Sequence, residues 1–345
     1  MKALICGYYG KGNAGDEAIL TALLQMLPNE IEPIILSNDP LETKNRYQVQ
    51  AVDSRSFREI LSALRHVDLF IWGGGSLLQD VSSLASPLYY LGLMALSTQM
   101  GLITIAWAQG IGPLNHFLTK LVTKQVLKKV KRISVRDIGS LDLLKSWNLD
   151  AVLALDPVWA LQSNFVQNFS NLQGPKVAIN LRPHEDLSLQ RISQLATGLN
   201  LFAKATHTSL LLVPFQVSQD LPIAHRLSDL IEVPHEIVQI NDPRELKGIF
   251  REIDMLIGMR YHSLIMAASE GSRAFALSYD PKVDRLMEQV GIPGWKINEI
   301  PSSPEEISDA LLNHYREQSS LSSAQIKSFY NSALLHKELF LNFND

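Results

Sequence analysis

The sequence contains a single cysteine, Cys6, among its 345 residues, so it cannot form an intrachain disulfide. Cys6 lies in an apolar run that predicts a strand, where we interpret the thiol as a packing group and not as a nucleophile. Recognisable metal-ligand patterns are also missing: there is no Asp-x-Asp, no His-Glu-x-x-His and no paired Cys/His spacing. We therefore expect a mechanism that uses no metal.

A P-loop lysine motif and Gly-x-Ser-x-Gly are absent as well. The net charge is only −4, with 19% charged residues, which does not fit the broad basic surface of a nucleic-acid-binding protein. An anionic ligand must therefore be held by a local cluster of cations. Any phosphate chemistry would depend on Arg, His and Lys side chains.

Residues 81–119 contain no Asp, Glu, Lys or Arg. A membrane span needs ~20 mostly apolar residues, but Pro, Gly and polar residues interrupt this stretch, so we predict a buried helix at about 88–100 and a strand at 103–106. The N-terminus begins a strand directly and does not resemble a signal peptide, which predicts a cytoplasmic protein. If the substrate is lipid-linked, the 81–119 region or another apolar surface would give peripheral contact with the inner face of the membrane.

Short apolar runs typical of strands alternate with helical patterns along the whole chain. The predicted strands are residues 3–6, 31–36, 69–72, 103–106, 132–135, 152–155, 176–180, 209–213, 237–240, 255–257 and 273–276. This alternation predicts an α/β protein whose parallel sheets are covered by helices on both faces. We expect two doubly wound, Rossmann-like lobes facing a cleft, namely residues 1–165 and 175–320, and a C-terminal helix within 321–345 that packs back on the first lobe.

The segment Gly10-Lys11-Gly12-Asn13-Ala14-Gly15 follows the first predicted strand and formally matches the dinucleotide-binding pattern G-x-G-x-x-G. The next helix, however, begins with Asp16 and Glu17, whose carboxylates would stand where a pyrophosphate must bind. An NAD site is therefore not expected. These carboxylates either complement the helix dipole or, together with Asn13 and Gly15, face sugar hydroxyls.

Three further loops follow predicted strands of the first lobe. The glycines of Gly73-Gly74-Gly75-Ser76-Leu77-Leu78-Gln79-Asp80 allow close approach of a ligand, or only a sharp turn before a helix. Gln109-Gly110-Ile111-Gly112-Pro113 would lie beside them. In Ser134-Val135-Arg136-Asp137, the arginine either pairs with an Asp or contacts the ligand. These loops predict a binding edge that includes Gly74, Gly75, Asp80 and Arg136.

The second lobe carries an anion site at the end of its strand 255–257. The strand runs into Arg260 and His262, and an apolar helix begins directly after it, so both side chains should lie near a helix N-terminus. Arg182 follows the first strand of this lobe and Lys282 follows the strand 273–276. We predict that these four side chains converge on a small ligand that carries both a carboxylate and a phosphate.

The combination of these motifs resembles the polysaccharide pyruvyl transferase family, in particular its bacterial cell-surface type, which modifies an N-acetylmannosamine unit of a cell-wall polymer precursor. The matching stretches run from residue 7 to about 285 and are GNAGDEAIL, GGGSLLQD, AQGIGP, SVRD, the pair Arg260-x-His262, and SYDPKV with Lys282. The resemblance implies a fold similar to that of two-lobed GT-B glycosyltransferases. It also implies phosphoenolpyruvate as donor, bound in the second lobe by Arg260, His262 and Lys282, with a further contact from Arg182.

The implied reaction adds two sugar hydroxyls to C2 of the enolpyruvyl group, releases phosphate and leaves a cyclic pyruvate ketal. We expect His262 to deliver the proton to the methylene carbon. Asp16 would orient or deprotonate a sugar hydroxyl on the first lobe, with Asn13 and Asp80 as neighbours. No cofactor is expected besides phosphoenolpyruvate as co-substrate, and the acceptor would be a sugar or a lipid-linked oligosaccharide.

Two other functions fit the same architecture. A nucleotide-sugar glycosyltransferase would need an acidic residue for the ribose near the ligand-binding helix of the second lobe, where Glu270 is the candidate. A non-catalytic two-lobed binding protein would need no proton donor among its anion ligands, so His262 argues against it.

Overall fold

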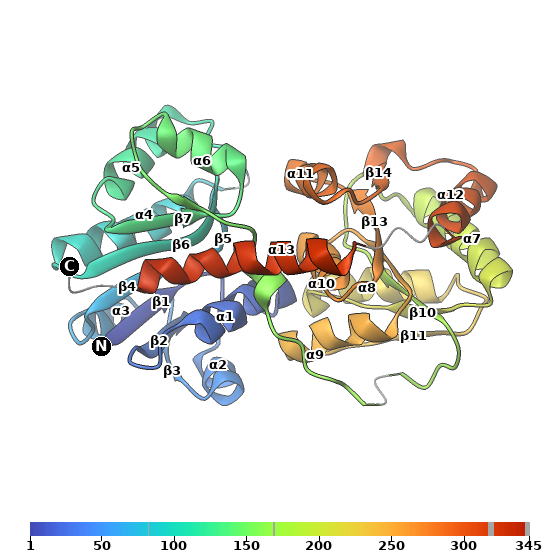
Figure 1. Ribbon diagram of the computed structural model, residues 1–345, viewed down its shortest axis with the longest axis horizontal. Helices are drawn as coiled ribbons and strands as arrows, with labels where there is room; N and C mark the ends of the chain where they lie inside the picture. The colour runs from blue at the N-terminus through green and yellow to red at the C-terminus, as the bar shows by residue number, and fades with distance from the viewer. Residues whose placement is uncertain (82, 168–169, 317–320, 342–345) are drawn as a thin grey trace. The chain divides into compact units, whose positions relative to one another are not determined.

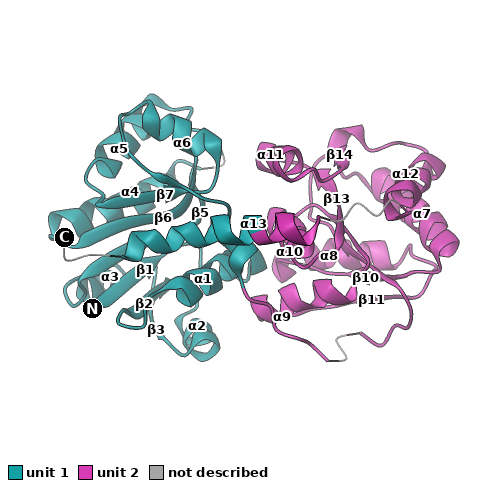
Figure 2. Ribbon diagram, in the orientation of Figure 1, with its two compact units in different colours: residues 1–161, 328–345 teal, residues 162–327 magenta. Residues whose placement is uncertain are grey.

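The computed structural model describes residues 1–81, 83–167, 170–316 and 321–341. The chain forms two compact units, shown in different colours in Figure 2. The first unit comprises residues 1–161 together with the C-terminal segment from Ser328 onward, and the second comprises residues 162–327. The C-terminal segment thus returns to the first unit after the second unit is complete.

The first unit is built on a parallel sheet with strand order β3-β2-β1-β4-β6-β7-β8, in which β5 also pairs with β6 (Figure 1). Its strands are β1 (Lys2–Cys6), β2 (Glu32–Ser37), β3 (Gln50–Asp53), β4 (Leu69–Trp72), β5 (Gly75–Leu78), β6 (Ile103–Ile111), β7 (Arg132–Val135) and β8 (Val152–Leu153). Its helices are α1 (Ala14–Met26), α2 (Pro40–Tyr47), α3 (Phe57–Leu64), α4 (Ala85–Gln99), α5 (Phe117–Leu127), α6 (Ile138–Lys145) and the 3₁₀ helix η1 (Pro157–Ala160). The continuous apolar sequence of β4 is fully buried, as expected for a central strand of a parallel sheet.

The second unit repeats this architecture with a six-stranded parallel sheet of order β11-β10-β9-β12-β13-β14. Its strands are β9 (Lys176–Asn180), β10 (Ser209–Leu212), β11 (His235–Ile237), β12 (Met255–Gly258), β13 (Arg273–Ser278) and β14 (Gly294–Lys296). The helices are α7 (Leu189–Thr206), α8 (Val217–Ser228), α9 (Pro243–Gly248), α10 (Tyr261–Ser269), α11 (Pro281–Val290) and α12 (Pro304–Arg316), with the 3₁₀ helices η2 (Ile249–Glu252) and η3 (Ile297–Glu299). The predicted α/β class with two parallel Rossmann-like sheets is confirmed.

The direction of strand addition reverses between β1 and β4 in the first sheet, and between β9 and β12 in the second. In doubly wound proteins, loops that diverge from the carboxyl ends of two such strands leave a crevice in which ligands bind. The loops that begin at Gly7 and Gly73 leave this point in the first unit, and those that begin at Leu181 and Met259 leave it in the second. All four loops contain sequence motifs singled out above.

Several predicted elements differ from the observed ones. The strands β3, β5 and β14 were not predicted, and β11 lies at His235–Ile237 instead of 237–240. The helix predicted at 88–100 begins at Ala85, and it is not wholly buried, because Leu88 and Tyr89 are 51% and 38% exposed. No helix in the described ranges is long and apolar enough to cross a membrane.

The C-terminal segment consists of α13 (Ser323–Leu334) and the 3₁₀ helix η4 (Leu335–Phe340), where the sequence had predicted one helix. His336 fixes the C-terminal segment against the first unit: its Nδ1 lies 2.9 Å from the Ser134 hydroxyl, and its Nε2 lies 2.8 Å from the Leu155 carbonyl oxygen. The Trp107 ring lies 5.3 Å from the same imidazole at an interplanar angle of 52°, and its indole N–H donates to the His336 carbonyl. Burial lowers the pKa of His336 to about 4, so the ring is neutral in the folded protein.

Candidate active site

Arg260 occupies the N-cap position of α10, directly after the buried strand β12. Its guanidinium is held by Asp220 at the start of α8: Nε and Nη2 donate to the two carboxylate oxygens at 3.1 and 2.5 Å. The Asp220 carboxylate also accepts the backbone N–H groups of Phe215 and Gln216. This bidentate pair fixes the position and orientation of the guanidinium plane.

Nη1 of Arg260 has no hydrogen-bond partner among the described residues, whereas Nε and Nη2 both donate to protein oxygens. The backbone at Arg260 is fixed by Asn180, the last residue of β9, whose side-chain oxygen accepts the Arg260 N–H at 3.0 Å. The Asn180 amide donates in turn to the Val213 carbonyl beyond β10. The carboxyl ends of β9, β10 and β12 are therefore locked together around Arg260.

Arg182, Tyr279 and Lys282 form a second cationic group. Nη1 of Arg182 donates to the Tyr279 hydroxyl at 3.1 Å, and the guanidinium carbon lies 4.6 Å from the centre of the Tyr279 ring. The ammonium nitrogen of Lys282 lies 6.0 Å from the same ring centre and 3.5 Å from the carboxylate of Asp280. Nε of Arg182 is buried and has no hydrogen-bond partner among the described residues. Arg182 and Lys282 thus both lie against the ring of Tyr279.

The Arg182 group lies next to Arg260, because the Arg182 backbone N–H contacts Met259 Sδ at 3.4 Å. His262 lies in the first turn of α10 with its ring 5.2 Å from that of Tyr261. The four residues predicted in this unit therefore follow three neighbouring strands, β9, β12 and β13. Three cations and a histidine at one sheet edge, near the N-termini of α10 and α11, suit a small ligand with several negative charges.

In the first unit, the loop between β1 and α1 is fixed by its own polar residues. Asn13 caps α1 by accepting the N–H of Gly15 at 3.1 Å. Glu17 is buried and accepts hydrogen bonds from the Gly10 N–H and the Tyr47 hydroxyl, at 2.8 and 2.6 Å. Desolvation raises the pKa of Glu17 despite these bonds. The alternative in which Glu17 faces sugar hydroxyls is therefore wrong, because its buried carboxylate binds the backbone of the loop between β1 and α1.

Asp16 is half-buried and lies beside the triple-glycine loop: its Oδ1 is 3.9 Å from the position that a Cβ on Gly75 would occupy. That loop leads into the short strand β5 and not directly into a helix, which corrects the sequence interpretation. A Cβ on Gly74 would lie 2.9 Å from Ile19 and 3.0 Å from the Ala108 carbonyl oxygen. Gly74 thus serves close packing of the loop on α1 and β6.

Asp80 and Arg136, both predicted at this edge, already have protein partners. Asp80 accepts the N–H groups of Asn115 and His116 at 2.7 and 2.9 Å. Burial opposes its ionisation, but these two N–H groups hold the pKa of Asp80 below its ordinary value. Arg136 is buried and pairs with Asp156 at 2.5 Å. Both side chains position the loops of the edge.

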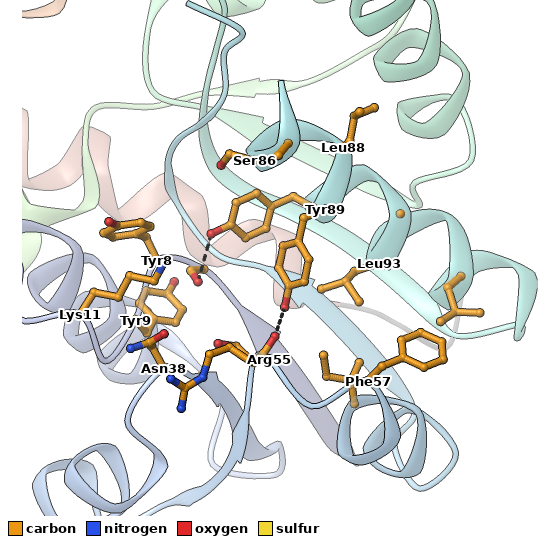
Figure 3. A pocket seen from close by; sticks show the side chains of 17 residues that line it. Tyr8, Tyr9, Lys11, Asn38, Arg55, Phe57, Ser86, Leu88, Tyr89 and Leu93 are labelled. Atoms are coloured by element: carbon orange, nitrogen blue, oxygen red, sulfur yellow. Dashed lines mark hydrogen bonds between the residues drawn. The ribbon is translucent and has the colours of Figure 1, made fainter. Parts of the chain in front are cut away.

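A pocket of about 640 Å³ lies in the first unit between the loop after β1, the start of α3 and one face of α4 (Figure 3). Tyr8 and Lys11 stand on one side of it, with the ammonium nitrogen of Lys11 4.2 Å from the centre of the Tyr8 ring. Tyr89 lines another side and donates its hydroxyl to the Ser54 carbonyl at 2.7 Å. The rest of the lining is mostly apolar and includes Phe57, Ile60, Leu88, Leu93 and Leu96.

The fold places the chain in a known structural class. A putative UDP-N-acetylglucosamine 2-epimerase from Listeria monocytogenes superposes with a TM-score of 0.68 at 9% identity, covering 99% of this chain and 94% of that one. The UDP-GlcNAc 2-epimerase from Neisseria meningitidis gives 0.62 at 12% identity, covering 99% and 100%. MurG from Acinetobacter baumannii gives 0.54 at 12% identity, covering 99% of each chain. Such distant similarities define the fold, which is of the GT-B type.

The particular family follows from the sequence profile of the polysaccharide pyruvyl transferases, which matches residues 13–281. The match begins at Asn13, continues through Asp16, Arg182, Arg260 and His262, and ends next to Lys282. Because it covers most of the chain, the protein belongs to the polysaccharide pyruvyl transferase family and is an enzyme that transfers a pyruvyl group to a saccharide acceptor.

Sequence reasoning missed three contributors to these sites. Asp220 lies 40 positions before Arg260, and only the polar run Gln216–Asp220 after the strand β10 could have suggested its role. Tyr279 lies in the stretch SYDPKV, in which only Lys282 had a predicted role. The aromatic lining from Tyr8 and Tyr89 has no sequence signature, because the two residues come from distant segments.

Proposed function

We propose that the enzyme uses phosphoenolpyruvate as its donor and binds it at the carboxyl ends of β9, β12 and β13. The observation that carries this proposal is the position of Arg182, Arg260 and Lys282, which directly follow three neighbouring strands. Phosphoenolpyruvate carries a carboxylate and a phosphate on a three-carbon unit, and both groups need cationic donors within a short distance. The fixed guanidinium of Arg260, with Nη1 available, suits a planar oxyanion.

An addition and a substitution form the ketal. In the first, a sugar hydroxyl attacks C2 while its proton goes to a base, and C3 receives a proton to become the methyl group. In the second, the C2–O bond to phosphate breaks, the neighbouring sugar hydroxyl attacks C2 and loses its proton, and inorganic phosphate leaves. His262 is the proposed acid for C3 because it lies in the first turn of α10, two residues from Arg260.

Cations act mainly in the second step. Arg260, Lys282 and Arg182 would balance the negative charge that builds on the departing phosphate, and the helix N-termini of α10 and α11 add to this effect. Tyr279 orients two of these cations through its ring and hydroxyl. In this mechanism, residues of the second unit stabilise the charge on the departing phosphate, and residues of the first unit activate the acceptor hydroxyl.

We further propose that the sugar acceptor binds in the first-unit pocket. Tyr8 and Tyr89 offer ring faces on which the apolar face of a sugar can stack, and Lys11 and Asn38 offer polar contacts beside them. Asp16 lies in the first turn of α1, which Asn13 caps, and would orient or deprotonate the attacking hydroxyl. An N-acetylmannosamine unit of a cell-wall polysaccharide precursor is the acceptor that the family resemblance favours.

The competing glycosyltransferase function gains weight only from the fold, because the structural neighbours include sugar-nucleotide enzymes. Its required acidic residue, Glu270, lies within salt-bridge distance of two cations: the carboxylate is 3.8 Å from Lys247 Nζ and pairs with Arg251. A carboxylate that is already paired with two cations is poorly placed to accept hydrogen bonds from ribose hydroxyls. The family match also favours pyruvyl transfer.

Calorimetric titration with phosphoenolpyruvate tests the donor site. The wild type should bind, and Lys282→Ala should bind at least roughly tenfold more weakly because a charge-assisted contact is lost. Arg260→Lys should also weaken binding, because an ammonium group cannot hold Asp220 through two nitrogens and present a third to the ligand. Lys296→Ala, at an exposed lysine of the same unit, is the matched control and should bind normally. Binding of a nucleotide sugar without binding of phosphoenolpyruvate would establish the glycosyltransferase instead.

A further inference from the structure

The chain has a long segment without acidic residues. Between Asp80 and Asp137 there is no Asp or Glu, although the protein as a whole has net charge −4. The same segment contains seven cations, namely Lys120, Lys124, Lys128, Lys129, Lys131, Arg132 and Arg136. This segment forms α4, β6, α5 and β7 of the first unit. Positive charge is therefore concentrated on one part of an otherwise slightly acidic protein.

Large apolar side chains are exposed where two helices of this segment begin. Phe117, Leu118 and Leu121 in α5 are 77%, 71% and 41% exposed, and Leu84 and Leu88 at α4 are 46% and 51% exposed. Single exposed apolar residues are common on protein surfaces, but neighbouring ones that form a patch usually mark a contact site. We call these five residues the α4–α5 edge.

The two halves of the α4–α5 edge are joined by Asp80. This carboxylate lies just before α4, and it accepts the N–H groups of Asn115 and His116, the two residues that precede α5. The helices α4 and α5 also pack against each other. The starts of the two helices therefore lie near each other at the carboxyl-terminal edge of the first sheet, and Figure 1 shows α4 and α5 at one side of this unit.

The outward face of α5 is amphipathic along its length. Thr119, Thr123 and Val126 face the core, so the residues on the opposite side, at 117, 121, 124 and 128, face outward. Phe117 and Leu121 thus stand at one end of this face, and Lys124 and Lys128 at the other. Lys120, Lys124 and Lys128 form no ion pair with any residue in the described part of the chain.

We propose that the α4–α5 edge is a docking surface for a lipid bilayer with anionic headgroups. Phe117 and Leu118 would enter the headgroup layer, while Lys120 and Lys124 contact lipid phosphates. A second copy of this chain is a poor occupant, because a two-fold contact would bring the lysines of α5 in one copy against the same lysines in the other. Leu88 belongs both to this edge and to the pocket lining, so docking holds the pocket beside the lipid surface.

Flotation with vesicles tests the docking surface, and it requires neither donor nor acceptor, so its outcome is independent of the proposed function. The full chain should float with vesicles of mixed phosphatidylglycerol and phosphatidylcholine, but not with phosphatidylcholine alone, and salt should weaken the binding. Phe117→Ser/Leu118→Ser should reduce partitioning roughly tenfold or more. Lys120→Gln/Lys124→Gln should reduce it about 25-fold, at about fivefold for each lost cation.

The matched controls replace leucines and a lysine that are also exposed but lie outside the α4–α5 edge. Leu41→Ser/Leu189→Ser replaces two leucines that are 70% and 65% exposed, and Lys44→Gln removes an exposed lysine of α2; both variants should float like the wild type. Absence of flotation with the anionic vesicles overturns the proposal, as does equal loss in the controls. Sedimentation analysis adds a further test: a wild-type dimer that becomes monomeric in Phe117→Ser/Leu118→Ser, with no vesicle binding, would identify a self-association surface instead.

Discussion

Arg260 and Asp220 form a buried bidentate ion pair that joins the start of α10 to the start of α8. The arginine side chain is 10% exposed and the aspartate side chain 0%. Breaking such a pair is costly, because the remaining charge stays buried without its partner. The pair therefore supports the proposed donor site by fixing the position of the Arg260 guanidinium.

Substitution Asp220→Ala should lower the free energy of unfolding by about 3 kcal/mol or more, since it leaves a buried cation and two unpaired backbone N–H groups. Urea denaturation of the full chain measures this loss. The exposed residue Asp229, near the end of the same helix, provides the control, and Asp229→Ala should change stability by no more than about 0.5 kcal/mol. Equal stability of the two variants would contradict the structural role of the pair.

Substitution His262→Ala should reduce kcat by about 100-fold to 10,000-fold and leave phosphoenolpyruvate affinity almost unchanged, because general-acid catalysis acts in the transition state. Phosphate release and calorimetry, performed on the same preparation, separate the two effects. His225→Ala, at an exposed histidine of α8, should leave both quantities unchanged. Full turnover by His262→Ala would remove this residue from the mechanism.

Substitution Gly92→Phe should raise the KM for the acceptor at least roughly tenfold while phosphoenolpyruvate still binds normally. Gly92 lies on α4 in the pocket lining, and a Cβ built there meets no atom within 4 Å, so a ring can enter the pocket without displacing the fold. Gly92→Ala is the matched control, and it should stabilise the helix by about 0.5–1 kcal/mol without filling the pocket. Unaltered acceptor kinetics in Gly92→Phe would place the acceptor elsewhere.

His336 should make the stability of the protein depend on pH. Its pKa is about 4 in the folded protein and ordinarily 6.5, so the unfolded chain binds the proton more readily between these values. The contribution is fully present above pH 6.5 and is lost as the pH falls toward 4, by at most about 3 kcal/mol. Urea denaturation across this range should show a smaller decline for His336→Gln than for the wild type. An identical decline in both proteins would exclude the effect, and His225→Gln should behave as the wild type.

The sequence was sufficient for most strands of the two sheets and for the position of three cations at neighbouring strand ends, because both depend on local patterns. Central strands such as β4 and β12 are short apolar runs bounded by glycine or polar residues, and functional side chains directly follow them. Since the carboxyl ends of parallel strands meet at one edge, Arg182, Arg260 and Lys282 could be grouped without a structure. The outer strands β3 and β14 escaped prediction because they are only four and three residues long and have no fully buried residue.

Pairings between distant segments could not be predicted from one sequence. The roles of Asp80 and Arg136 depend on partners that fold beside them, namely the backbone at Asn115 and His116 in one case and the Asp156 carboxylate in the other. The pocket depends on three segments that have no common motif. Glu17 illustrates the same limit, because a carboxylate in the first turn of a helix gives no sign in the sequence that it turns inward.

The return of the C-terminal segment to the first unit has a consequence for biosynthesis. Trp107 is fully buried, and part of its cover is His336 and Phe340, which a ribosome makes more than 200 residues later. The second unit, a continuous segment, is complete at residue 327 and can fold while the first still lacks its last pieces. The unit that is translated first is thus the one that matures last, and during elongation its central tryptophan stays without its final cover.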